Sequence, residues 1–270
     1  MPESAPSLPA GRIETESVQV SESRDGVVEL TIASKPLGVL RTGVKRALRE
    51  TLARLERESA VRCLVLTGVQ AAFSVGSDIR EFRQEPGWLL ESELVENDLN
   101  DAIERSSLPV IAACNGHTFG GGAVLALACD MRIAAASARF GFPEVQVGAF
   151  ASGGGTQRLP RLVGRGRAMD LLFTGRIIDA REALAIGLVE DVVPDAKLME
   201  RARELATRIA SAPASAIGAS KRCVNTGLRD GIANGMGLEL RLAVETGLTE
   251  DAVEGQRAFM EKRIPRFGRP

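Results

Sequence analysis

The residues best suited to chemistry lie in one glycine-rich stretch, where an apolar run ends at Asn115-Gly116 and three glycines, Gly120 to Gly122, open a second apolar run. Glycine lets the backbone N–H groups at a helix start approach a ligand, because no side chain stands in the way. The helix dipole adds partial positive charge at the same point. The pattern therefore predicts a place that stabilises an oxygen on which negative charge develops during a reaction.

Three further segments follow recognisable patterns around the triple glycine. Residues 72–79 are similar to A-F-S-A-G-A-D-I/L, residues 140–148 to F-x-x-P-E-x-x-x-G, and residues 153–160 to G-G-T-Q-R-L-P. Together with the triple glycine, they resemble the signature of the crotonase superfamily, the enoyl-CoA hydratase/isomerase group, over residues 15–268. Four motifs in the expected order make the resemblance far more specific than any one of them.

The resemblance implies an activity and a place for it. Members of this family bind a coenzyme A thioester with its carbonyl oxygen between two backbone N–H groups, which by motif position belong to Ser77 and Gly121. A proton leaves the carbon beside the carbonyl, and the charge moves onto the oxygen as an enolate. Loss of one such donor costs a factor of about 10²–10³ in rate. We therefore expect an enzyme that acts on an acyl-CoA thioester, with Ser77 and Gly121 as catalytic donors.

The resemblance also supplies a base. Glu144 matches the family's catalytic glutamate and directly follows the expected strand segment 139–143. A positioned carboxylate contributes about 10²–10⁴-fold as a general acid or base. Burial near the apolar side chains of Phe142 and Phe150 is expected to raise the pKa of Glu144.

One position departs from the hydratases of the family. They carry a second glutamate two residues after the triple glycine, where this chain has Val124, which can neither accept nor donate a proton. No acidic residue nearby replaces it, and Ser152 occupies the loop position where dienoyl isomerases have an extra acid. We therefore predict double-bond isomerisation with Glu144 as the single acid and base. Two alternatives stay open: enoyl-CoA hydration despite Val124, and an acyl-CoA-binding homologue with little turnover.

Further positions are expected to contact the substrate. Asp78, Ile79 and Arg80 follow the oxyanion loop and are expected to line the nucleotide end of coenzyme A. Phe259 and Lys262 match a family F-x-x-K pattern that approaches the adenine and its phosphate, and lysine favours phosphate electrostatically. Two positions beside the expected amide donor complete the predicted substrate contacts, namely Gly120 and Val124.

The elements that must position these residues follow from hydrophobic periodicity. Apolar strands around an Asp-Gly turn predict a hairpin, and apolar residues at helical spacing predict helices. The expected strands are 18–20, 27–32, 63–67, 109–113, 131–135, 138–142 and 188–193. The expected helices are 43–58, one that leads into the strand at 109–113, one that begins at Asp179, and then 196–211, 213–226, 231–246 and 249–263.

This order predicts an α/β protein in which a strand–helix core is followed by helices alone. We expect a disordered tail at 1–14, an α/β core at 15–195 and a helical region at 196–270. The resemblance implies that the core is a spiral of ββα units. It also implies that the C-terminal helices assemble a homotrimer or a dimer of trimers.

Composition argues against several other classes. The net charge of −1 disfavours nucleic-acid binding, which needs a basic excess. A single histidine disfavours a zinc site built from histidines, and no cofactor is expected beyond the coenzyme A of the substrate. Four cysteines without a C-x-x-C pair suit a reducing compartment, so we expect a cytoplasmic protein. No apolar stretch is long enough to predict a membrane span.

Overall fold

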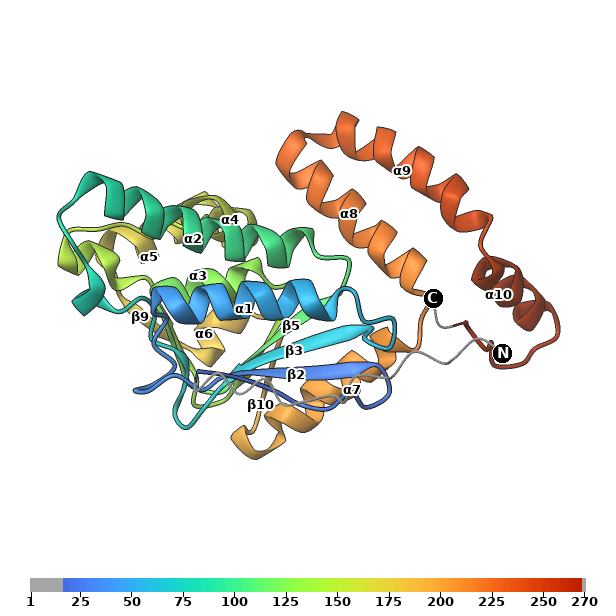
Figure 1. The fold of residues 1–270 in the computed structure, drawn as a ribbon, viewed down its shortest axis with the longest axis horizontal. Helices are drawn as coiled ribbons and strands as arrows, with labels where there is room; N and C mark the ends of the chain where they lie inside the picture. The colour runs from blue at the N-terminus through green and yellow to red at the C-terminus, as the bar shows by residue number, and fades with distance from the viewer. Residues whose placement is uncertain (1–16, 269–270) are drawn as a thin grey trace, which may run out of the picture.

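The computed structural model describes residues 17–268, so the tail expected at 1–14 lies outside the described residues. The larger of its two sheets has six strands, all parallel except for the first pair (Figure 1). In spatial order the strands are β1 (Val18–Val20), β2 (Val27–Ile32), β3 (Cys63–Gly68), β5 (Val110–Cys114), β7 (Met131–Ala135) and β10 (Asp191–Val193). The central strands β3, β5 and β7 are buried along almost their whole length, because helices cover both faces of the sheet.

The smaller sheet has four short strands. They are β4 (Ala72–Ser74), β6 (His117–Phe119), β8 (Arg139–Gly141) and β9 (Ile177–Asp179). The first three run parallel to one another, and β9 pairs antiparallel with β8. This arrangement places the carboxyl ends of β4, β6 and β8 at one edge of the sheet.

The two sheets are built from one repeated unit: a strand of the larger sheet, a turn, a strand of the smaller sheet and a helix. The first unit comprises β3, β4 and α2 (Pro86–Arg105), and the second comprises β5, β6 and α3 (Gly121–Ala128). A third begins with β7 and β8 and continues through the 3₁₀ helix η2 (Pro143–Val147) into α4 (Gly155–Val163). This spiral confirms the ββα fold that the resemblance implied, and its unequal connections explain why the sequence shows no fixed repeat period.

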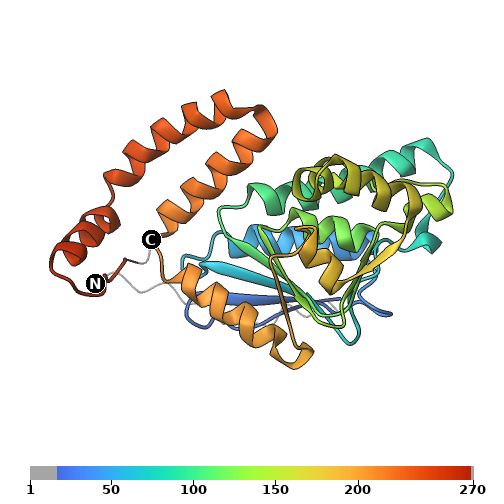
Figure 2. The same cartoon turned by 180° about the vertical axis from the view of Figure 1, so that it is seen from behind.

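The helices are divided between the two faces of the larger sheet. α1 (Thr42–Leu55) lies with α2 and α3 over one face, whereas α7 (Leu198–Ala210) packs against β2, β3, β5 and β7 on the other (Figures 1 and 2). The remaining helices are α5 (Arg165–Thr174), α6 (Ala180–Ala185), α8 (Ala214–Asp230), α9 (Ile232–Gly247) and α10 (Glu250–Met260), with the 3₁₀ helices η1 (Ile79–Glu81) and η3 (Asp195–Lys197).

The C-terminal helices form an arm that extends away from the core. α8 and α9 pack against each other as a hairpin, and α10 follows at the end of α9 (Figures 1 and 2). The expected boundary at 195/196 falls before α7, and α7 still covers the larger sheet. The projecting part of the chain therefore begins only with α8.

Periodicity located the long elements within a few residues. The hairpin of β1 and β2 forms as expected, with Asp25 (φ 51°) and Gly26 (φ 79°) in its turn. The strands β4, β6 and β9 of the smaller sheet were not predicted, because three residues are too few to show an alternating pattern. The helices α4 and α5 were not predicted either. Among residues 17–268, every helix is too short or too polar to cross a lipid bilayer.

Candidate active site

The predicted catalytic residues meet at one edge of the smaller sheet. Because β4, β6 and β8 run parallel and side by side, the segments that follow them leave the sheet together. Ser77 follows β4, Gly121 follows β6, and Glu144 follows β8. The Gly120 amide donates to the Gly141 carbonyl at 3.0 Å and joins the last two of these segments. Three stretches far apart in the sequence thus deliver the predicted groups to one place.

The amides of Ser77 and Gly121 lie close together. A Cβ atom added to Gly121 would lie 3.5 Å from the Ser77 nitrogen, and one added to Gly76 would lie 2.8 Å from the Gly121 nitrogen. Gly76 therefore has to be glycine, and its φ of 90° adds a second reason. Neither amide donates to another protein atom within residues 17–268, so both are available to a ligand oxygen.

The start of α3 adds positive potential beside these two amides. The helix begins at Gly121, its N-cap is Gly120 with φ 53°, and no side chain caps it. The first N–H groups of the helix are thus left without side-chain acceptors, and the positive end of the helix dipole lies beside them. The triple glycine therefore has the structural role that its sequence predicted.

The Glu144 carboxylate lies beside the turn that opens α3. Its Oε1 would be 3.7 Å from a Cβ atom on Gly120, and its Oε2 is buried without a hydrogen-bond partner among the described residues. Burial raises the pKa of Glu144, as the sequence predicted, and the negative charge of Glu96 adds to the rise. Phe142 is buried, as expected, whereas Phe150 is 68% exposed. A carboxylate of this kind is suited to take up and return protons.

Val124 lies in the first turns of α3 and is 1% exposed. A Cβ atom on Gly155 would lie 2.9 Å from its Cγ2, so the start of α4 packs tightly against this valine. The position where the hydratase pattern has its second glutamate is therefore a closed apolar contact between two helices.

An ion pair beside Ser77 was not predicted from the sequence. Lys45 of α1 donates to the Ser77 hydroxyl at 2.9 Å and also to Glu96 Oε2, while the same hydroxyl donates to Glu96 at 3.1 Å. The sequence did not predict an acidic residue here, and α2 brings Glu96 to the site, 51 positions after Lys45 in the chain. The sequence did contain a sign of this ion pair. Lys45 lies on the apolar stripe of α1, three residues before Leu48, so its buried charge needs a partner.

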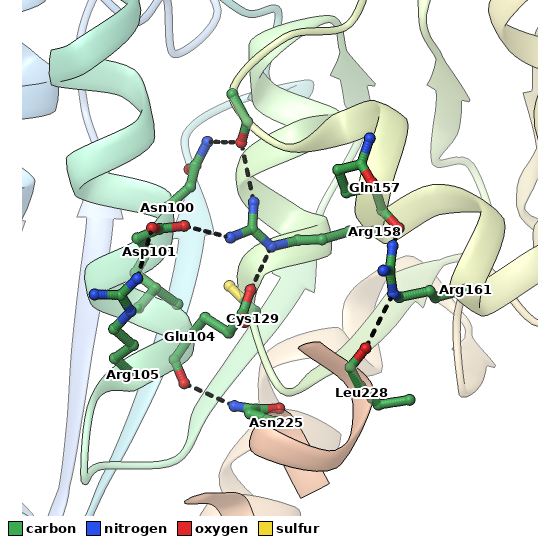
Figure 3. Close-up of polar contacts among 12 residues, drawn as sticks. Asn100, Asp101, Glu104, Arg105, Cys129, Gln157, Arg158, Arg161, Asn225 and Leu228 are labelled. Carbon is green, nitrogen blue, oxygen red and sulfur yellow. Dashed lines mark hydrogen bonds and ion pairs between the residues drawn. The ribbon is translucent and has the colours of Figure 1, made fainter. Parts of the chain in front are cut away.

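Helix α2 is fixed against the loop that precedes α4 (Figure 3). Asn100 donates to the Gly153 carbonyl at 2.9 Å, and Arg158 donates to the same oxygen at 3.0 Å. Arg158 also forms ion pairs with two carboxylates of α2, Asp101 at 2.9 Å and Glu104 at 2.6 Å. The G-G-T-Q-R-L-P segment therefore clamps α2 in place.

The residues expected at the nucleotide end lie where the chain leaves the oxyanion loop. Asp78 caps η1 and is held between Arg80 at 2.8 Å and Arg41 at 3.0 Å. The hydrogen bonds from Arg80 hold the pKa of Asp78 well below its usual range. Ile79 is exposed beside this pair. Contact of Asp78, Ile79 and Arg80 with coenzyme A stays a prediction.

The structure does not bring the expected C-terminal contacts to this edge within one chain. Phe259 lies in α10 and is 85% exposed, and Lys262 follows the end of that helix. α10 lies at the far end of the arm, away from the smaller sheet (Figures 1 and 2). Contact of Phe259 and Lys262 with the substrate stays a prediction.

Comparison with known proteins agrees with this geometry. The family model described as enoyl-CoA hydratase/isomerase matches residues 22–270. A short-chain-enoyl-CoA hydratase of Clostridium acetobutylicum is 37% identical over 246 residues, which cover 89% of this chain and 94% of that protein.

Solved structures are also similar to this chain over almost its whole length. An enoyl-CoA hydratase of Geobacillus kaustophilus superposes with a TM-score of 0.92 at 32% identity, over 96% of this chain and 99% of that one. An enoyl-CoA hydratase of Bacillus anthracis gives 0.89 at 36% identity, over 93% and 98% of the two chains. The fold and the site thus define an enzyme of the crotonase superfamily. The chain belongs to its enoyl-CoA hydratase/isomerase family, whose members are lyases or isomerases.

Proposed function

We propose that this protein acts on an enoyl-CoA thioester through an enolate and that its favoured reaction is a shift of the double bond. The thioester oxygen accepts hydrogen bonds from the amides of Ser77 and Gly121, and the N-terminus of α3 adds positive potential there. Loss of a proton from the carbon beside the carbonyl places negative charge on that oxygen. Because both donors are backbone groups held by the fold, they need no reorganisation as the charge develops.

Glu144 carries the proton in this reaction. In a 3-enoyl thioester, the ionised carboxylate takes a proton from carbon 2, and the electron pair of that C–H bond forms a dienolate with the 3,4 double bond. The protonated carboxyl then returns the proton to carbon 4, which leaves a 2,3 double bond and an unchanged Glu144. The raised pKa of Glu144 makes it a stronger base than an exposed glutamate.

The apolar packing of Val124 is the observation that favours isomerisation. One proton carrier suffices to move a double bond, whereas hydration also needs a water molecule aimed at carbon 3. Hydration is the second candidate function, because similar proteins carry the name enoyl-CoA hydratase and because Glu96 brings another carboxylate to the site. An acyl-CoA-binding homologue with little turnover is the third.

We also propose assembly as a homotrimer or a dimer of trimers. Four apolar side chains follow one another at four-residue spacing along α9, each at least 60% exposed: Ile232, Met236, Leu240 and Val244. This spacing places them on one face of the helix. An exposed apolar face of this kind marks a protein interface. The same assembly can bring Phe259 and Lys262 of one copy to the site of another.

No cofactor is proposed beyond the coenzyme A of the substrate, because protein groups supply both the proton carrier and the oxyanion donors. The four cysteines are free, and three of them are buried: Cys63, Cys114 and Cys129. Free thiols suit the cytoplasmic location that we propose.

A product assay tests the proposed function. Purified protein is incubated with 3-enoyl-CoA and 2-enoyl-CoA thioesters of several chain lengths, and the products are separated. We expect 3-enoyl-CoA to become 2-enoyl-CoA, at a rate about 10²–10⁴-fold lower in Glu144→Gln. Glu91→Gln changes an exposed carboxylate of α2 and serves as the control with unchanged turnover. Equal rates in Glu144→Gln and wild type would exclude Glu144 as the base. Binding of an acyl-CoA without any turnover would instead favour the binding homologue.

A further inference from the structure

The ion pair of Lys45 and Glu96 brings a second carboxylate to the catalytic edge of the smaller sheet. The two side chains are only 4% and 12% exposed, so they are fixed in the protein interior rather than moving in solvent. Glu96 uses Oε2 to accept hydrogen bonds from Lys45 and from the Ser77 hydroxyl. Its other oxygen, Oε1, accepts no hydrogen bond from residues 17–268. One acceptor of this carboxylate is thus available to a ligand.

The available oxygen lies next to the glycines of the site. A Cβ atom on Gly121 would lie 3.3 Å from Glu96 Oε1, and one on Gly153 would lie 2.7 Å from it. The neighbouring Gly120 has the same relation to the other carboxylate, since its Cβ atom would lie 3.7 Å from Glu144 Oε1. Glu96 and Glu144 therefore flank a single glycine turn, which is the turn that presents the Gly121 amide.

We infer that Glu96 orients a water molecule for addition to carbon 3, so that the protein also hydrates 2-enoyl-CoA thioesters. Because the step uses the same amides and the same Glu144, it rests on the proposed function. One hydrogen of the water is donated to Glu96 Oε1, and the other is donated to Glu144. Glu96 is a positioning residue in this arrangement, and Glu144 stays the proton carrier.

The hydration step balances with Glu144 alone as acid and base. The water oxygen bonds to carbon 3 while its O–H bond to the hydrogen on Glu144 breaks and the proton passes to that carboxylate. The π electrons of the 2,3 double bond move toward the thioester, whose oxygen holds the enolate charge at Ser77 and Gly121. Glu144 then gives the same proton to carbon 2. The product is a 3-hydroxyacyl thioester, and Glu144 is restored.

Lys45 and the Ser77 hydroxyl hold Glu96 by its Oε2 oxygen, so that Oε1 stays in a fixed place where it can orient a water molecule. An ionised carboxylate accepts strong hydrogen bonds from water. Glu96 therefore supplies, from α2, the second carboxylate that the hydratase pattern has at the position of Val124.

Glu96 has the rigid support that such positioning needs. One turn further along α2, Asn100 and Asp101 tie the helix to the Gly153 carbonyl and to Arg158 (Figure 3). Placement errors near 1 Å can cost about 10²-fold in rate, so a held carboxylate is far more effective than a mobile one.

The test compares two reactions in one set of variants. Hydration of 2-enoyl-CoA and isomerisation of 3-enoyl-CoA are measured for wild type, Glu96→Ala and the double variant Lys45→Met with Glu96→Met. The double variant removes both charges together, so no buried charge is left without its partner. Glu91→Ala is the matched control, because Glu91 also pairs across α1 and α2, with Arg46, but is 63% exposed.

We expect wild type to hydrate 2-enoyl-CoA, and both Glu96 variants to lose about 100-fold in the kcat of hydration. The kcat of isomerisation should fall far less than that of hydration, because the amides and Glu144 are retained and only the charge of Glu96 beside Glu144 is lost. The KM of the thioester should change by less than about threefold. Wild-type protein that isomerises without hydrating overturns the inference, as does a parallel fall of both reactions in the double variant. Glu144→Gln separates failure of this inference from failure of the proposed function. If the proposed function is right, Glu144→Gln loses both reactions; if it is wrong, Glu144→Gln matches wild type.

Discussion

At the scale of single residues, the site depends on the Glu144 carboxylate, which lies in surroundings that disfavour its ionised form. Glu144 has one buried oxygen without a partner, and it lies near the negative charge of Glu96. Both features raise its pKa, and a raised pKa makes the ionised carboxylate a stronger base. The same features make ionised Glu144 destabilising for the fold, since a buried polar atom without a hydrogen bond costs free energy.

This conflict predicts a pH-dependent stability difference between wild type and Glu144→Gln. The pKa of Glu144 is higher in the folded chain than in the unfolded chain, where it is about 4.3. Below that value both states are protonated. As the pH rises toward the folded pKa, only the unfolded state ionises and wild type loses stability. We expect Glu144→Gln to be the more stable protein at pH 7, by up to about 1 kcal/mol.

Urea unfolding at several pH values measures this difference. The gap between the two proteins should open as the pH rises above about 4.3 and become constant above the folded pKa of Glu144. Glu91→Gln should show no such gap, because Glu91 is exposed. A gap that is absent at pH 7, or that opens toward acid pH, would contradict the burial assigned to Glu144.

At the scale of elements, buried polar contacts hold the arm helices against the core. The arm helix α8 is tied to the core by Lys221, which donates to the Leu108 carbonyl at 3.0 Å and to Asp130 at 2.8 Å. Asp130 in turn accepts from the Val110 amide at 2.7 Å, at the start of β5. Burial raises the pKa of Asp130, so its ionised form depends on Lys221 as a partner.

Lys221→Met is therefore expected to destabilise the protein by about 3 kcal/mol, because it leaves Asp130 buried without its counter-charge. Adding Asp130→Asn should restore part of the loss, since the amide carbonyl can still accept from Val110. Unfolding in urea at one fixed protomer concentration measures both changes. A double variant no more stable than Lys221→Met alone would show that the charge pair is not the cause.

At the scale of the whole molecule, one chain leaves its arm incomplete. Residues 17–268 leave the apolar face of α9 uncovered, and α10, which carries Phe259, lies far from the core of its own chain (Figure 2). Burial of the apolar face of α9 between copies of the chain would remove apolar area from water. The same assembly would allow Phe259 of one copy to reach a nucleotide bound to another, so we expect assembly and substrate binding to be linked.

Leu240→Asp tests that link, because it places a charge in the middle of the apolar face of α9. We expect the proposed trimer to dissociate and the KM for the thioester to rise about tenfold, the effect of roughly 1.4 kcal/mol lost from binding. Light scattering after gel filtration and steady-state kinetics measure the two effects. Glu239→Ala alters the adjacent exposed residue and should change neither. A Leu240→Asp protein that is still trimeric would show that this face is not the interface.

The sequence by itself determined the long elements and most of the catalytic edge. Apolar periodicity is a local property, so it located the helices of the arm and the buried strands of the larger sheet. The motif around the triple glycine identified Gly121, because glycine leaves the backbone N–H at a helix start open to a ligand. Motif position also identified Ser77 and Glu144 as the residues that the structure brings together.

Only the tertiary structure decided what surrounds these residues. The short strands β4 and β6 carry no pattern of their own, and the edge that they share with β8 exists only because the ββα units stack. Lys45 and Glu96 belong to different helices, and the sequence of neither helix predicts that it packs against the other. Their contact arises from the packing of α1 against α2, a long-range property that local spacing does not encode.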